Sequence, residues 1–149
     1  MSDVVDLSSV LPIDTAVLDI VVPGTSKRTG WSITFAGPNH PKTVAQNERL
    51  ARHNLEREQR IEMARVNGRK WKGDNKSVDE ARRENVEWIV SRIVDWTPIK
   101  IAQFSPDPVA FSEKVAIELL AQPYMVAFFA QMVDFLQAEA SFTPASAMN

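Results

Sequence analysis

Apolar and polar residues alternate near the start of the chain in a way that predicts two β-strands. The first segment, residues 16–22, is rich in β-branched residues and is followed by the turn-forming pair Pro23 and Gly24. Three apolar residues of the second segment are separated by single polar residues: Trp31, Ile33 and Phe35. Alternation places them on one face, so we expect a β-hairpin over residues 15–36. An isolated hairpin is marginal in water, so this face must pack on helices of the same chain or on another subunit.

The pattern then changes to a long segment without proline or glycine, which predicts a charged helix over residues 43–67. Its apolar positions are sparse. Charges of opposite sign recur in four-residue steps at Glu48, Arg52, Glu56 and Arg60. Each such pair stabilises an exposed helix by about 0.3 kcal/mol. A helix this polar is expected to project into solvent or to lie against a partner, rather than inside a core.

The next helix is predicted over residues 78–94. Ser77 and Glu80 form a capping box at its start, in which the serine side chain accepts a backbone N–H. Five β-branched residues follow with helical spacing: Val86, Ile89, Val90, Ile93 and Val94. This stripe indicates a buried face.

Two C-terminal helices are expected, over residues 113–121 and 124–140. Ser112 is the predicted N-cap of the first, and Pro123 separates the two because proline cannot continue a helix without losing a hydrogen bond. The last helix carries a wide apolar stripe of Met125, Phe128, Phe129, Met132, Val133 and Leu136. Before these helices, residues 99–101 and 109–111 are short extended segments that can pair as a second hairpin.

These elements predict an α+β fold that is mainly helical, with a small N-terminal β-hairpin and about four α-helices. We expect a single domain over residues 15–142 between flexible tails at residues 1–14 and 143–149. A chain of 149 residues can bury a substantial core. The absence of cysteine excludes disulfides and a thiolate nucleophile, and the net charge of −2 gives no general attraction to nucleic acid or anionic membranes.

No group of residues in the sequence has the pattern of a catalytic or metal site. The two histidines, His40 and His53, are too far apart for ligands on one helix, and no cysteine can complete a set. The carboxylates Glu56, Glu58 and Glu62 alternate with arginines, which is typical of a solvated helix face. We therefore expect a protein that is not an enzyme, holds no cofactor or metal, and acts by binding other proteins.

A basic stretch between Arg65 and Arg83 contains Trp71 near its middle. Basic residues beside an aromatic ring can follow a phosphate backbone while the ring stacks on a base. A solvated loop whose tryptophan folds back on the core is the favoured interpretation, and a protein-binding patch is a third. We expect no membrane partner, because the longest apolar runs are far shorter than the roughly 20 residues of a membrane span.

Several short motifs follow one another over residues 16–143. They are Val22-Pro23-Gly24, Thr29-Gly30-Trp31-Ser32-Ile33, Ala36-Gly37-Pro38, Ile93-Val94-Asp95-Trp96, Phe111-Ser112, Leu119-Leu120 and Ser141-Phe142, with the charged helix between the third and the fourth. In this order the chain resembles the tail assembly chaperones of long-tailed bacteriophages and prophages.

The resemblance implies a non-catalytic assembly factor that coats the hydrophobic tape-measure protein and keeps it soluble. It also implies recruitment of the tail-tube protein, self-association, and action in the cytoplasm of the infected bacterial host. The expected partner-binding residues are seven apolar side chains: Trp31, Ile33, Phe35, Trp71, Phe128, Phe129 and Met132. Two other interpretations are a structural component of the virion, in the head or tail, and a small nucleic-acid-binding accessory protein.

Overall fold

The computed structural model describes residues 4–68 and 77–144. It has an α+β fold that is mainly helical, as the sequence predicts. Its strands are β1 (Thr15–Val21), β2 (Arg28–Ala36) and β3 (Ile93–Trp96), and its α-helices are α1 (Pro41–Val66), α2 (Val78–Val90), α3 (Glu113–Leu120) and α4 (Val126–Gln137). Three 3₁₀-helices complete the described chain: η1 (Ser8–Val10), η2 (Pro123–Met125) and η3 (Glu139–Phe142).

The predicted hairpin forms, but it is part of a larger sheet. Strands β1 and β2 are antiparallel, with Leu18 opposite Ile33, and β3 pairs antiparallel with the other edge of β2. Gly24 takes φ 80° in the turn between β1 and β2, a conformation that glycine adopts without steric cost. The third strand was not predicted from the sequence.

The prediction of a helix over residues 78–94 is wrong at its C-terminal end. Helix α2 ends at Val90, and Ile93 and Val94 lie in β3 instead. Both residue types favour strands when a partner strand is available, and β2 supplies one, with Phe35 opposite Ile93. Tertiary pairing therefore overrides the helical spacing of these two residues.

Three other predictions also differ from the structure: the start of α1, the length of the last helix and the second hairpin. Helix α1 begins at Pro41 rather than at residue 43, because the His40 ring accepts the backbone N–H of Lys42 and proline suits the first helical position. The last helix is α4 over Val126–Gln137, shorter than the predicted 124–140, with 3₁₀ turns before and after it. The predicted second hairpin reduces to one bridge between Ile99 and Val109.

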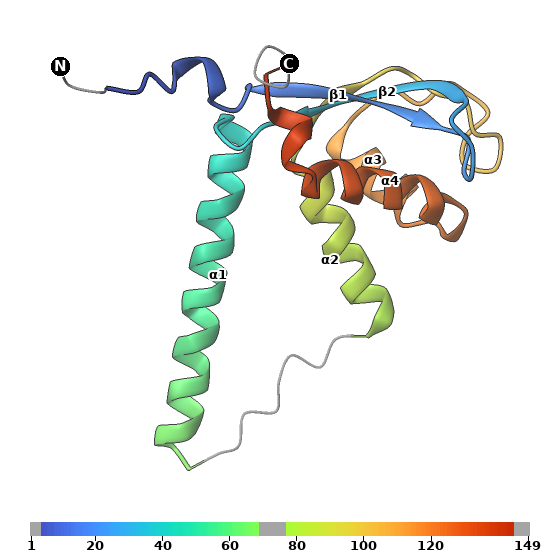
Figure 1. Ribbon diagram of the computed structural model, residues 1–149. Helices are drawn as coiled ribbons and strands as arrows, with labels where there is room; N and C mark the ends of the chain where they lie inside the picture. Colours follow the sequence, from blue (N-terminus) through green and yellow to red (C-terminus); the bar gives the residue numbers. More distant parts are fainter. Residues whose placement is uncertain (1–3, 69–76, 145–149) are drawn as a thin grey trace.

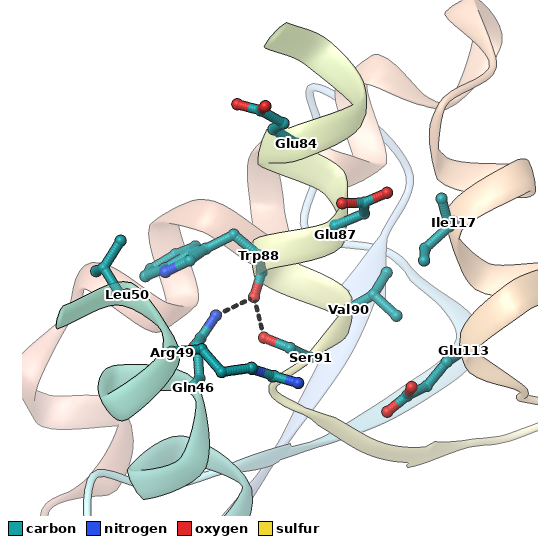
Figure 2. Close-up of a pocket in the computed structure, with 10 residues that line it drawn as sticks. All are labelled: Gln46, Arg49, Leu50, Glu84, Glu87, Trp88, Val90, Ser91, Glu113 and Ile117. Atoms are coloured by element: carbon teal, nitrogen blue, oxygen red, sulfur yellow. Dashed lines mark hydrogen bonds between the residues drawn. The ribbon is translucent and has the colours of Figure 1, made fainter. Parts of the chain in front are cut away.

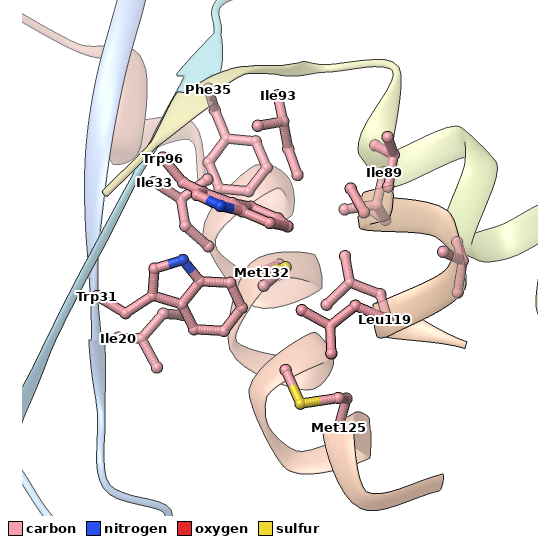
Figure 3. Close-up of a cluster of buried hydrophobic side chains, with 14 of the residues drawn as sticks. Ile20, Trp31, Ile33, Phe35, Ile89, Ile93, Trp96, Leu119, Met125 and Met132 are labelled. Carbon is pink, nitrogen blue, oxygen red and sulfur yellow. The ribbon is translucent and has the colours of Figure 1, made fainter. Parts of the chain in front are cut away.

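The core lies between one face of the sheet and the helices α2, α3 and α4 (Figure 3). Alternation works as predicted: Trp31, Ile33 and Phe35 are all buried. The ring centroids of Trp31 and Trp96 are 5.3 Å apart in an edge-to-face arrangement, and Trp96 donates its indole N–H to the carbonyl oxygen of Val109 at 3.2 Å. The contact with Val109 ties β3 to the irregular segment before α3.

Two parts of the chain lie apart from this core. Helix α1 extends away from the sheet, and residues 4–13 lead away from β1 (Figure 1). The N-terminal residues are exposed, but their end is held by two backbone hydrogen bonds: Ile13 donates to Phe142 at 2.9 Å, and Gly37 donates to Asp14 at 2.6 Å. We call residues 4–13 the N-terminal arm.

Candidate protein-binding site

In the part of the chain that the structure describes, the buried residues of helix α1 lie near its start. Among its residues, Thr43 and Gln46 are buried, whereas every residue from 47 to 60 is exposed. Lys42 forms an ion pair with Glu113 of α3 at 3.2 Å. The polar sequence of α1 explains this arrangement, because a helix without a continuous apolar stripe gains little from lying on a core.

The attachment depends on Gln46. Its side-chain Nε2 donates to the carbonyl oxygen of Trp88 at 2.7 Å, and Ser91 Oγ donates to the same oxygen at 2.7 Å (Figure 2). This carbonyl lies near the C-terminal end of α2, where helix carbonyls lack partners within the helix. The buried amide therefore links α1 to the end of α2.

A cleft opens beside this link, between α1, α2 and the start of α3. Its volume is about 460 Å³. Leu50 from α1 and Trp88 from α2 lie next to each other in its lining (Figure 2), and their exposed fractions are 45% and 41%. Its other lining residues are Gln46, Arg49, Glu84, Glu87, Val90, Ser91, Glu113 and Ile117. We call this region the α1–α2 cleft.

The chemistry of the α1–α2 cleft suits a protein partner. Its lining combines apolar side chains with charged ones, as protein interfaces do. The apolar ones are Leu50, Trp88, Val90 and Ile117, and the charged ones are Arg49, Glu84, Glu87 and Glu113. Tryptophan is enriched among the residues that dominate binding energy. Grooves between helices are a common docking place for a further helix.

The sequence analysis did not single out Trp88 or Leu50. Trp88 lies between Val86 and Ile89, off the stripe that α2 buries against the core. A tryptophan outside the apolar stripe of an amphipathic helix is the signal that could have indicated it.

The residues that were predicted to contact a partner lie elsewhere. Trp31, Ile33, Phe35 and Met132 are buried in the core of this chain, where a bound partner cannot reach them. Their apolar spacing is explained by core packing.

Phe128 and Phe129 are partly buried, and their neighbours differ. Phe128 packs edge-to-face on Trp31 with centroids 6.2 Å apart, whereas Phe129 lines a smaller apolar pocket between α2 and α4. Trp71 and most of the basic stretch around it lie outside the described residues.

Comparison of the chain with models of known protein families, with curated proteins and with solved structures finds no match.

Within residues 4–68 and 77–144, no three histidine, aspartate or glutamate side chains are grouped so as to hold a metal ion. His40 caps α1, and His53 is exposed on the same helix. No single described helix is long and apolar enough to cross a membrane; α3 and the segment Pro123–Gln137 pass that test only together, bent by 92°.

Replacing Gln46 with alanine is expected to lower the free energy of unfolding by about 1 kcal/mol. The loss is limited because Ser91 still donates to the Trp88 carbonyl oxygen, which is therefore not left without a partner. Urea denaturation measures the change, and hydrogen exchange at the start of α1 should accelerate. The exposed neighbour Asn47 provides the control variant Asn47→Ala, and equal stability of the two variants would contradict an anchoring role for Gln46.

Proposed function

We propose that this protein is a non-catalytic tail assembly chaperone of a long-tailed bacteriophage or prophage. In this role it binds the tape-measure protein, keeps it soluble in the cytoplasm of the infected host, and helps recruit tail-tube subunits. It also associates with further copies of itself. The observation that carries the proposal is α1, a helix of 26 residues that is exposed over most of its length and adjoins a cleft lined by a half-exposed tryptophan.

An exposed helix of this kind supports a binding role on physical grounds. Most helices in proteins owe their stability to tertiary packing, whereas the described structure buries only Thr43 and Gln46 of α1. A partner helix laid along α1 would contact its free apolar residues, among them Leu50, Leu55 and Met63, which are all more than 40% exposed. The many charges of α1 would keep the unbound protein soluble.

The proposed partner surface differs from the one expected from sequence. We now assign it to α1 and to the α1–α2 cleft, because the hairpin face is committed to the core. The wide apolar stripe of α4 is likewise turned toward the core at Met132, while Phe129 stays at a pocket between α2 and α4. Self-association and contact with tail-tube subunits remain parts of the proposal without an assigned surface.

The test is co-expression of this chain with the tape-measure protein of the same gene cluster, followed by purification and mass determination. We expect a soluble complex with several copies of this chain for each tape-measure protein. Trp88→Ala should reduce the recovered complex at least about tenfold, since a central interface tryptophan contributes about 2 kcal/mol or more. The matched control is Tyr124→Ala, which removes a similarly exposed aromatic ring (43%) outside the α1–α2 cleft.

Two outcomes would contradict the proposal. In one, the tape-measure protein stays insoluble while this chain is recovered alone. In the other, this chain is found by mass spectrometry in purified virions, which favours a structural component of the head or tail. Equal recovery with Trp88→Ala and Tyr124→Ala would overturn the assignment of the α1–α2 cleft, although not the chaperone role.

A further inference from the structure

Arg92 is the most deeply buried charged residue among those the structure describes, with an exposed fraction of 9%. It follows α2 directly and joins three segments. Its Nε and Nη2 atoms donate to the carbonyl oxygen of Ala36 at 3.2 and 2.6 Å, and its backbone carbonyl accepts the N–H of Ala36 at 2.7 Å. Its guanidinium carbon lies 5.5 Å from the centroid of the Phe142 ring.

Among the side chains that the structure describes, which are those of residues 4–68, 77–138 and 141–144, no carboxylate forms an ion pair with this guanidinium. Burial lowers the pKa of Arg92 from its ordinary value. Charged groups inside proteins are normally paired, because removing an ion from water is costly. Its two bonds to one carbonyl oxygen and its ring contact supply no counter-charge, and the described side chains supply none either.

One nitrogen of this guanidinium remains available. Within the described residues, Nη1 makes no hydrogen bond. It is also in contact with solvent, because the only fully buried side-chain polar atom without a partner among those residues is Nε1 of Trp31. Arg92 lines an open cavity of about 360 Å³. The cavity walls come from the N-terminal arm and the C-terminal segment, chiefly Val10, Pro12, Leu136 and Phe142. We call this cavity the Arg92 pocket.

We propose that the Arg92 pocket binds a carboxylate carried on an alkyl chain. The guanidinium supplies a planar, permanently charged donor, which pairs well with a carboxylate. Gln137 and Thr143 also line the pocket, and its apolar residues, among them Val10, Leu136 and Phe142, would cover the alkyl part, which inorganic phosphate lacks. The carboxylate can belong to an acidic side chain of another protein molecule or to a free small molecule, and this inference is independent of the proposed function.

The direct test uses hexanoate as the probe and follows the Nε–H signal of Arg92 by NMR. We expect saturable shifts of Arg92 and of the residues around Phe142. Hexanamide, which has the same chain without the charge, and inorganic phosphate should both fail to produce them. Equal binding of hexanamide would show that the cavity takes apolar chains without using Arg92, and would overturn the inference.

A second test leaves Arg92 in place, because removing this buried residue could unfold the protein. Val10→Glu places a carboxylate at the mouth of the Arg92 pocket from the half-exposed arm, so it should occupy the site and weaken hexanoate binding at least about tenfold. Val5→Glu adds the same charge to the same arm away from the pocket and should bind like the unchanged protein. Equal hexanoate affinity in the two variants would overturn the inference.

The oligomeric mass then separates the two sources of the carboxylate. This comparison applies once Val10→Glu has been shown to lose hexanoate binding. If the oligomeric mass then falls in Val10→Glu but not in Val5→Glu, the site is supported and its carboxylate comes from a second copy of this chain. An unchanged mass supports the site with a carboxylate from a different molecule. Sedimentation of both variants and of the unchanged protein measures this.

Discussion

Replacing Trp96 with alanine is expected to lower the free energy of unfolding by about 3–5 kcal/mol. Trp96 is almost completely buried, and its ring contacts both Trp31 and Phe111 edge-to-face, with centroid distances of 5.3 and 5.2 Å. Truncation removes both contacts and leaves a cavity that the surrounding core cannot fill completely. It also leaves the carbonyl oxygen of Val109 without its indole donor. Since domains of this size are stable by only about 5–15 kcal/mol, much of the total stability is lost.

Urea denaturation followed by circular dichroism measures this loss. The control is the same substitution at Trp88, which is 41% exposed, compared with 4% for Trp96. We expect Trp88→Ala to cost about 1 kcal/mol, because exposed positions contribute little to stability. Comparable losses at Trp88 and Trp96 would contradict the division between a core tryptophan and a surface tryptophan, and with it the α1–α2 cleft as a binding site.

Replacing Gly37 with alanine is expected to lower the free energy of unfolding by about 1–3 kcal/mol. A methyl group at this position would meet the backbone carbonyl oxygen of Ile13 and would lie 3.2 Å from a ring carbon of Phe142. Backbone atoms cannot yield as the end of a flexible side chain can. The N-terminal arm must therefore shift, and the hydrogen bonds Gly37 to Asp14 and Ile13 to Phe142 should weaken together.

Hydrogen exchange at the amides of Ile13 and Gly37 reports this shift directly, and urea denaturation gives its free energy. The control is Asn39→Ala in the same loop, which is exposed and should stay within about 0.5 kcal/mol of the unchanged protein. Exchange at Ile13 that is unaltered by Gly37→Ala would show that the arm is not held by this close approach. In that case, one wall of the Arg92 pocket would lose its structural basis.

Elements whose signals are local could be predicted from the amino-acid sequence. The alternation of Trp31, Ile33 and Phe35 sets the buried face of β2, because side chains of a strand alternate whatever its neighbours are. The caps are equally local: Ser77 accepts the N–H of Glu80 at 3.1 Å, and Ser112 accepts that of Val115 at 3.2 Å, both at the predicted helix starts. The α+β class followed from these elements.

The contacts between distant segments could not be predicted in this way, because they depend on how the chain packs. Ile93 and Val94 fit a helical stripe as well as a strand, and β3 forms because the free edge of β2 supplies its hydrogen bonds. In the sequence, Gln46 looks like any other polar residue of a charged helix. Its role depends on a hydrogen bond to the carbonyl oxygen of Trp88, which lies 42 positions away in the chain. The α1–α2 cleft and the Arg92 pocket exist for the same reason. Periodicity reports which face of an element is apolar, whereas the partner of that face depends on how the whole chain packs.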